Sequence, residues 1–245
     1  MKKFSVRFAV LVVLLAVLAC ASPPPDPTAT PVQTATAAPT ATPEPPVNRL
    51  SNPGLEMSWE KLPVNPIHEQ PSDWQLYEII TDSHTVDYPG VEGAQCYNFS
   101  PEIMDMNDPA HVAEGDHSMV IRMNYSSSEA GMYQLVEVEP NTLYTFTAQV
   151  KAVSTNPESP VIAAIGIDTH GGVDPSASTI VWTHLWYDKA NDDNTLPDST
   201  TSTYQTVTVT AVSASNYLTV YTYGFARWCD PKTEVYFDDL SLVQQ

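Results

Sequence analysis

After residue 47 the chain alternates apolar and polar residues, and this alternation is the strongest pattern in the sequence. It is clearest in residues 143–151, where every second position is apolar: Tyr144, Phe146, Ala148 and Val150. A period of two residues places these side chains on one face of an extended strand, while Thr and Gln residues occupy the other face. The segment is therefore predicted to be a strand that is buried on one face.

The same period recurs in eight further segments, namely 74–80, 118–125, 132–138, 161–167, 179–186, 204–212, 217–223 and 234–243. Residues typical of turns separate them, for example EPNT at 139–142. Helix-period segments of useful length are missing from the sequence. Because so many strands occur without helices that could connect parallel neighbours, the sequence predicts an all-β fold, an antiparallel β-sandwich.

The first 20 residues have a different character. Basic residues precede an apolar run at 8–18, which has the length of a signal-peptide core and is short for a membrane span. The residues directly before Cys20 are Val17, Leu18 and Ala19, and they resemble the bacterial lipoprotein box. This resemblance implies that residues 1–20 form a lipoprotein signal peptide and that Cys20 is lipidated. The alternative is ordinary secretion without a lipid.

Residues 21–47 consist almost entirely of Pro, Thr, Ala and Ser. Such a composition buries too little apolar surface to offset chain entropy, and it favours extended polyproline II conformation. The segment is therefore predicted to be a disordered linker. Residues 48–245 contain no further low-complexity break and are predicted to form one domain, held outward from the membrane toward the cell exterior or periplasm.

The domain at 48–245 is strongly acidic, with seven basic and 27 acidic residues and a net charge of −20. This charge argues against nucleic acid and against anionic lipid as partners, so that any membrane contact is expected through the lipid anchor only. It is compatible with cations and with neutral glycans. We expect the protein to be a monomer.

Lipidation of Cys20 would leave one pair of cysteines, Cys96 and Cys229, in a compartment that permits disulfides. We predict that the two form a disulfide. Two separate buried thiols are the alternative, because spacing in the sequence does not establish proximity.

Four segments occur in an order that is characteristic of one group of domains. They are NPGLE at 52–56, GDHSMVIRM at 115–123, GMYQLVEVEPNTLYTFTAQVKA at 131–152 and EVYFDDLSLV at 234–243. Together they resemble the jelly-roll carbohydrate-binding modules of the family 4, 9, 16 and 22 type. Leu55 stands where these modules usually have Phe, and the stretch 166–182 is missing from their shortest members. The resemblance implies a galactose-binding-like jelly roll whose first and last strands lie side by side.

The resemblance also implies a structural Ca²⁺ that joins the two ends of the domain. Glu56 and Asp238 match the positions of its carboxylate ligands, and Asp239 replaces Asp238 if the strand register is shifted by one. Backbone carbonyl groups around residues 114–117 would complete the six to eight oxygens that Ca²⁺ takes. The alternative is that Glu56 and Asp238 are solvated charges at a sheet edge.

Sugar rings pack on aromatic side chains, and their hydroxyl groups require polar partners. In residues 217–223, Leu218 and Val220 alternate with tyrosines. If these two aliphatic side chains face the core, the tyrosines lie on the opposite face of the strand. The same argument sends the side chain of Arg122 away from the core. The candidate carbohydrate-binding residues are Arg122, Trp182, Tyr221, Tyr223 and Trp228. Core packing is the alternative for each aromatic residue alone.

The sequence contains no Gly-x-Ser-x-Gly elbow, phosphate loop or His-Glu-x-x-His motif, and we assign no catalytic residue. The resemblance makes a surface-anchored, non-catalytic lipoprotein that binds carbohydrate, a polysaccharide or glycan, the leading hypothesis. A structural or adhesive surface protein that binds a protein partner is a second possibility. A small glycan-cleaving enzyme is a third, since a pair of catalytic carboxylates leaves no pattern in the sequence.

Overall fold

The computed structural model describes residues 46–88, 91–154, 161–186, 203–226, 229 and 233–245. The predicted signal peptide, Cys20 and nearly all of the predicted linker lie outside these residues. Residues 44–245 form one compact unit, and the fold described below is the fold of that unit. No helix among the described residues is long and apolar enough to cross a membrane.

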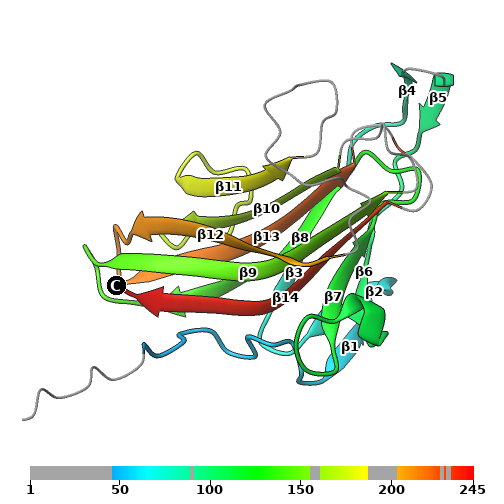
Figure 1. The fold of residues 1–245 in the computed structure, drawn as a ribbon. Helices are drawn as coiled ribbons and strands as arrows, with labels where there is room; N and C mark the ends of the chain where they lie inside the picture. Colours follow the sequence, from blue (N-terminus) through cyan, green and yellow to red (C-terminus); the bar gives the residue numbers. More distant parts are fainter. Residues whose placement is uncertain (1–45, 89–90, 155–160, 187–202, 227–228, 230–232) are drawn as a thin grey trace, which may run out of the picture. The chain divides into compact units, whose positions relative to one another are not determined.

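The described residues form strands joined by turns and loops, with one short 3₁₀ helix (Figure 1). The strands are β1 (Trp59–Leu62), β2 (Asn65–Pro71), β3 (Gln75–Ile79), β4 (His84–Tyr88), β5 (Val91–Cys96), β6 (Glu102–Met106), β7 (Ser118–Arg122), β8 (Glu129–Glu137), β9 (Leu143–Ser154), β10 (Val161–Asp168), β11 (Ile180–Trp186), β12 (Gln205–Val212), β13 (Tyr217–Ala226) and β14 (Thr233–Gln244), and the 3₁₀ helix is η1 (Pro109–His111). All nine predicted strands are present. The sequence analysis missed the strands β1, β2, β4, β5 and β6.

Two five-stranded antiparallel sheets build the domain. One has the order β11-β10-β13-β8-β3, and we call it the β13 sheet. The other has the order β12-β9-β14-β7-β6, and we call it the β14 sheet. The hairpins β1-β2 and β4-β5 form two further two-stranded sheets. The predicted all-β antiparallel sandwich is confirmed.

Apolar side chains at alternate positions of the strands fill the space between the two sheets. On β12, Val207 and Val209 are buried in the core, while the threonines between and around them are exposed. On β13, Leu218 and Val220 belong to the same core, as predicted from the alternation. The two inner faces therefore share one hydrophobic core, as in other sandwiches of aligned sheets.

The N-terminal segment lies along the last strand, β14. The backbone N–H of Arg49 donates to the carbonyl of Leu242 at 2.8 Å, and the backbone N–H of Leu242 donates to the side chain of Asn48 at 2.9 Å. The two ends of the domain are thus side by side, as the resemblance implies. Residues 52–56, however, form a turn and not a strand, with φ of 47° at Asn52 and 61° at Leu55.

A disulfide joins Cys96 at the end of β5 to Cys229, across 133 residues of sequence, and the two Cα atoms are 5.3 Å apart. This is the pairing that the sequence predicts. It ties the segment that leads into β6 to the segment that leads into β14.

Replacement of Leu55 by Ala should strongly destabilise the domain. The Leu55 side chain has no exposed surface and packs in the core beneath the N-terminal turn. A Leu→Ala change at such a site leaves a cavity and costs about 2–5 kcal/mol. Chemical denaturation would measure the loss. Leu143→Ala is the matched control, because Leu143 is 41% exposed, and it should cost less than about 1 kcal/mol. Equal losses in the two variants would contradict the assigned core.

Candidate functional site

Aromatic side chains gather on the outer face of the β13 sheet, opposite the shared core. They come from four strands, and we call the set the aromatic face: Tyr77 on β3, Tyr133 on β8, Trp182 on β11, and Tyr221 and Tyr223 on β13. On β3, β8 and β13 the rings alternate with residues that lie in or against the core. On β11, Trp182 pairs with Gly166 of β10, which itself alternates with the core residues Ile165 and Ile167. Burial of the inner face therefore directs these rings to the opposite side of the sheet.

The ring of Tyr221 lies at the centre of the aromatic face. Its centroid is 6.0 Å from that of Tyr77 and 5.8 Å from that of Tyr133. On the other side it is 5.9 Å from the centroid of Trp182, which is itself 5.6 Å from that of Tyr223. Tilted and edge-on arrangements at these distances are favourable for aromatic pairs. The rings thus form one connected cluster across the sheet.

The predicted residue Tyr221 lies on the expected face, but its side chain is fully buried. Its hydroxyl donates a hydrogen bond to the carbonyl of Gly172 at 2.7 Å, in the loop between β10 and β11. The rings around it remain partly exposed: Tyr77, Tyr133, Trp182 and Tyr223. Tyr221 therefore supports the surrounding rings, and a ligand on this face would contact its neighbours.

Two glycines allow the rings to lie close to the sheet. A Cβ atom at Gly166 would come within 2.6 Å of the indole ring of Trp182. A Cβ atom at Gly131 would come within 2.7 Å of the hydroxyl oxygen of Tyr77. The hydroxyl group of Tyr77 donates a hydrogen bond to the carbonyl of Thr222 at 2.6 Å. Larger residues at these two positions would displace the rings, so the glycines are part of the site.

A carboxyl group accompanies the rings. Glu129, on β8, forms a hydrogen bond with the hydroxyl of Tyr223. Burial raises the pKa of Glu129 above its usual range, and the bond to Tyr223 only partly opposes this effect. Burial also raises the pKa of the Tyr223 hydroxyl, and the neighbouring carboxylate adds to that shift. The face therefore offers a polar acceptor beside aromatic surface.

Of the other two predicted carbohydrate residues, Arg122 does not join this cluster. Arg122 lies on β7, in the β14 sheet, and its Nε donates to a carboxylate oxygen of Glu234 at 2.7 Å. The prediction that Arg122 shares a site with the tyrosines is wrong, because alternation shows which face a side chain takes but not which sheet the strand joins. Trp228 lies outside the described residues.

Tyr77, Tyr133 and Glu129 were missed by the sequence analysis. Tyr133 alternates with the core residue Met132 inside a predicted strand, so its outward position could have been read from the same period. Tyr77 lies in another predicted strand. What the sequence lacked was the pairing of β3 and β8 next to β13, which brings the three residues together.

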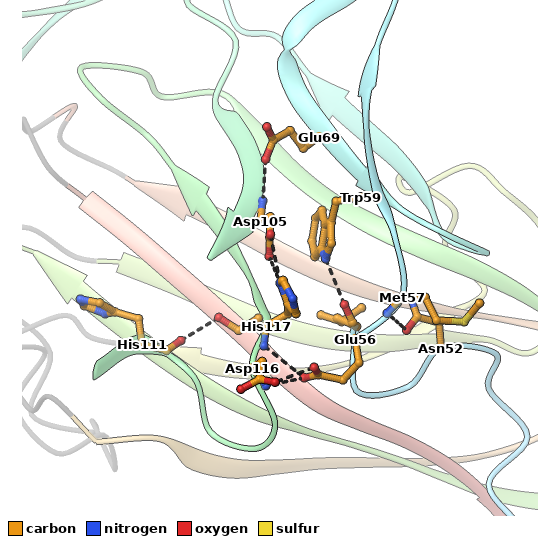
Figure 2. A network of polar contacts seen from close by, with 11 residues as sticks. Asn52, Glu56, Met57, Trp59, Glu69, Asp105, His111, Asp116 and His117 are labelled. Atoms are coloured by element: carbon orange, nitrogen blue, oxygen red, sulfur yellow. Dashed lines mark hydrogen bonds and ion pairs between the residues drawn. The ribbon is translucent and has the colours of Figure 1, made fainter. Parts of the chain in front are cut away.

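Glu56 and Asp238 hold the loop that precedes β7, as Figure 2 shows for Glu56. Glu56 accepts hydrogen bonds of 3.1 Å from the backbone N–H groups of Asp116 and His117. Asp238 accepts bonds of 2.7 Å and 3.0 Å from the backbone N–H groups of Ala113 and Glu114. Carboxylates from opposite ends of the domain thus meet at one loop, as the resemblance implies.

Among the described residues, Glu56 and Asp238 bring two carboxylates to this loop, whereas Ca²⁺ takes six to eight oxygen ligands. Burial raises the pKa of Asp238, and the negative charge of Glu56 adds to the shift, although three backbone N–H groups oppose it. The described residues contain no group of three His, Cys, Asp or Glu side chains placed to hold a metal ion. Around Asp238 and Glu56 the loop presents N–H groups, while Ca²⁺ takes oxygen ligands. Calcium binding by Glu56 and Asp238 stays a prediction.

A hydrogen-bonded pair of one histidine and one aspartate extends the same network (Figure 2). His117 Nδ1 lies 2.8 Å from a carboxylate oxygen of Asp105, on β6. This hydrogen bond is the main cause of a raised pKa at His117, and burial opposes it. The carboxylate of Glu69 accepts the backbone N–H of Asp105 at 3.2 Å, which ties β2 to the pair. The arrangement braces the loop, and His117 shows no serine or cysteine partner among the described contacts.

Comparisons with known proteins find similar structures but assign the chain to no family. No family model and no curated protein matches the chain. Among solved structures, TmCBM61 in complex with β-1,4-galactotriose is 14% identical, with 81% of this chain and 99% of that chain covered and a TM-score of 0.49. A CBM4 structure is 13% identical, with coverage of 80% and 99% and a TM-score of 0.41.

An arabinose-bound MgGH51 α-L-arabinofuranosidase is 11% identical over 80% of this chain, but only 26% of that enzyme is covered, and the TM-score is 0.47. Carbohydrate-binding modules are thus among the structures that this chain resembles. At such low identities and TM-scores the likeness carries no argument of its own, and the sandwich is established by the strand pairing described above.

Replacement of Glu129 by Gln should change how stability depends on pH. Burial raises the folded-state pKa of Glu129 above its unfolded value of about 4.3. The stabilisation that comes from the protonated carboxyl is therefore complete below about pH 4.3 and is lost as the pH rises through the folded-state pKa. We expect the wild type to lose stability relative to Glu129→Gln between pH 4 and pH 7. Chemical denaturation of both proteins across this range would measure the difference, and parallel pH profiles would contradict it.

Removal of calcium should lower the melting temperature if Glu56 and Asp238 hold the ion as the sequence predicts. The expected result is a lower melting temperature in chelator than in millimolar Ca²⁺, since an ion bound only to the folded state stabilises it. Asp238→Asn should abolish the difference, while Asp73→Asn, at an exposed position remote in sequence from the loop, should keep it. Identical melting temperatures of the wild type in chelator and in Ca²⁺ would contradict calcium binding at this loop.

Proposed function

We propose that this chain binds a neutral carbohydrate through the aromatic face of the β13 sheet and does not cleave it. One observation carries the proposal: five aromatic rings from four strands gather on a sheet face that takes no part in the core. A sandwich needs apolar side chains only on its inner faces, so the outer rings require another explanation.

The chemistry of the face suits a sugar. The C–H groups of a pyranose ring pack on aromatic rings, and the partly exposed rings of Tyr133, Trp182 and Tyr223 offer such surfaces. Glu129 provides an acceptor for a sugar hydroxyl at the edge of the cluster. The net charge of −19 disfavours anionic glycans and leaves neutral ones.

The proposal includes the anchor and the spacer that the N-terminal sequence predicts. Cys20 would carry a lipid after export, and residues 21–47 would hold the sandwich away from the membrane. A binding face on an extended tether can reach polysaccharide at a distance from the membrane surface. The support for this part is the sequence alone.

Binding should depend on Trp182 and Tyr133. The full chain would be screened against a broad panel of polysaccharides and oligosaccharides, with free sugar as competitor. We expect saturable binding that weakens tenfold or more, about 1.4 kcal/mol, in Trp182→Ala and in Tyr133→Ala, because each change removes a ring that would lie against the sugar. Val212→Ala, at a 52% exposed position on the other sheet, is the control and should bind like the wild type.

Three outcomes would count against the proposal. Unchanged binding in both ring variants, from proteins that melt like the wild type, would separate the aromatic face from carbohydrate. Release of reducing sugar by the chain would show cleavage. Capture of a protein partner that sugar does not displace would favour the adhesive alternative.

A further inference from the structure

A hollow lies at the β6-β7 edge of the β14 sheet. Its volume is about 370 Å³, which lies within the range of small-molecule sites. We call it the edge hollow, and the residues that matter here are Ile67, Asn98, Phe99, Glu102, Arg122 and Asn124. None of them belongs to the aromatic face, which is formed by the β13 sheet.

Two exposed aromatic rings mark this region. Phe99 lines the edge hollow and is 52% exposed, and Tyr97 is 40% exposed. The two rings are stacked, with centroids 5.0 Å apart and planes 13° from parallel. Since neither ring is buried in the core, burial on folding does not account for them. Exposed apolar surface of this kind is typical of binding sites.

Hydrogen bonds hold the backbone around these two rings in place. The N–H of Tyr97 donates to the carbonyl of Tyr125 at 3.0 Å, and the hydroxyl of Ser126 donates to the carbonyl of Phe99 at 2.6 Å. The disulfide of Cys96 directly precedes the two rings in the sequence. A rigid site saves the entropy of ordering side chains and loops on binding. Exposed rings on a fixed backbone are therefore prepared for contact.

Backbone strain accompanies the same segment. Tyr125 has a φ of 56°, in the left-handed region that bulky residues rarely adopt. Strained positions of this kind cluster at binding and catalytic sites, where the surrounding structure maintains them. Here the strained residue supplies the carbonyl that holds Tyr97.

The polar walls of the hollow select the ligand. Arg122 lies between two glutamates in the strand register, Glu102 on β6 and Glu234 on β14, and its Nε donates to Glu234 at 2.7 Å. Glu102 lines the hollow, while Glu234 lies outside the lining and neutralises Arg122, so the charge left at the hollow is negative and disfavours an anion. Asn98 lines the hollow, and its Oδ1 already accepts a hydrogen bond from the hydroxyl of Ser83 at 3.2 Å. The NH2 group of the same amide is a donor of the kind that suits a hydroxyl group.

We propose that the edge hollow is a second binding site for a neutral sugar unit, with the ring of Phe99 against the sugar and the NH2 group of Asn98 on one of its hydroxyl groups. The inference rests on the proposed function for the ligand class, while its residues belong to a different sheet. Two sites on opposite sheets would let one domain hold two glycan chains, or two parts of one chain, with a gain in avidity.

The test is protein-observed NMR on the full chain, titrated with methyl glycosides of glucose, galactose, mannose and xylose. We expect saturable shifts of the Phe99 ring and the Asn98 amide with at least one glycoside. Phe99→Ala should weaken binding at this site at least tenfold, whereas Phe99→Trp, which keeps an aromatic ring, should retain it. Trp182→Ala should leave the edge-hollow shifts in place, because Trp182 belongs to the other sheet.

The outcomes separate this inference from the proposed function. Shifts at Trp182 and Tyr133 without shifts at Phe99 would overturn the edge hollow and leave the aromatic face. Shifts at Phe99 alone would support the edge hollow and count against the aromatic face. A folded chain that responds at neither place to any glycoside would overturn both.

Discussion

Burial of one face of each sheet in a shared core is the constraint on which the rest of this molecule depends. Once Leu218 and Val220 of β13 take part in that core, Tyr221 and Tyr223 must lie on the opposite face. The same requirement on β8 brings Tyr133 to that face, and on β10 it brings Gly166 there, the residue with which Trp182 of β11 pairs. The aromatic face is thus a geometric consequence of the core together with the choice of residues at the outward positions. Those positions could have been threonines, as they are on β12.

The second organising feature is the closure of the domain at its two ends. The N-terminal segment lies along β14, and carboxylates from both ends bind the loop before β7 through backbone N–H groups. The disulfide of Cys96 and Cys229 ties a separate pair of segments. These links hold loops that would otherwise have many conformations, and the exposed rings of the edge hollow lie next to one of them.

The sequence was sufficient for the sandwich because period-two alternation is a local property. It gave the inward and outward positions of β9, β12 and β13 correctly. It could not tell which strands pair across the sheets, since register depends on contacts between distant residues. That is why Arg122 was grouped with the tyrosines, although β7 belongs to the other sheet, and why Tyr77 and Glu129 were missed. The strands β1 and β2 carry weaker alternation, and β2 contains two prolines, Pro66 and Pro71.

The central claim is that the aromatic face is the surface that contacts carbohydrate. Hydroxyl-radical footprinting of the full chain, with and without a saturating glycan from the panel, tests it most directly, since the partly exposed rings of Tyr133, Trp182 and Tyr223 are open to oxidation. The glycan should protect these three rings and leave Tyr217, 46% exposed at the start of β13, less affected. Saturating glycan that leaves all three rings as reactive as in the free chain would contradict it.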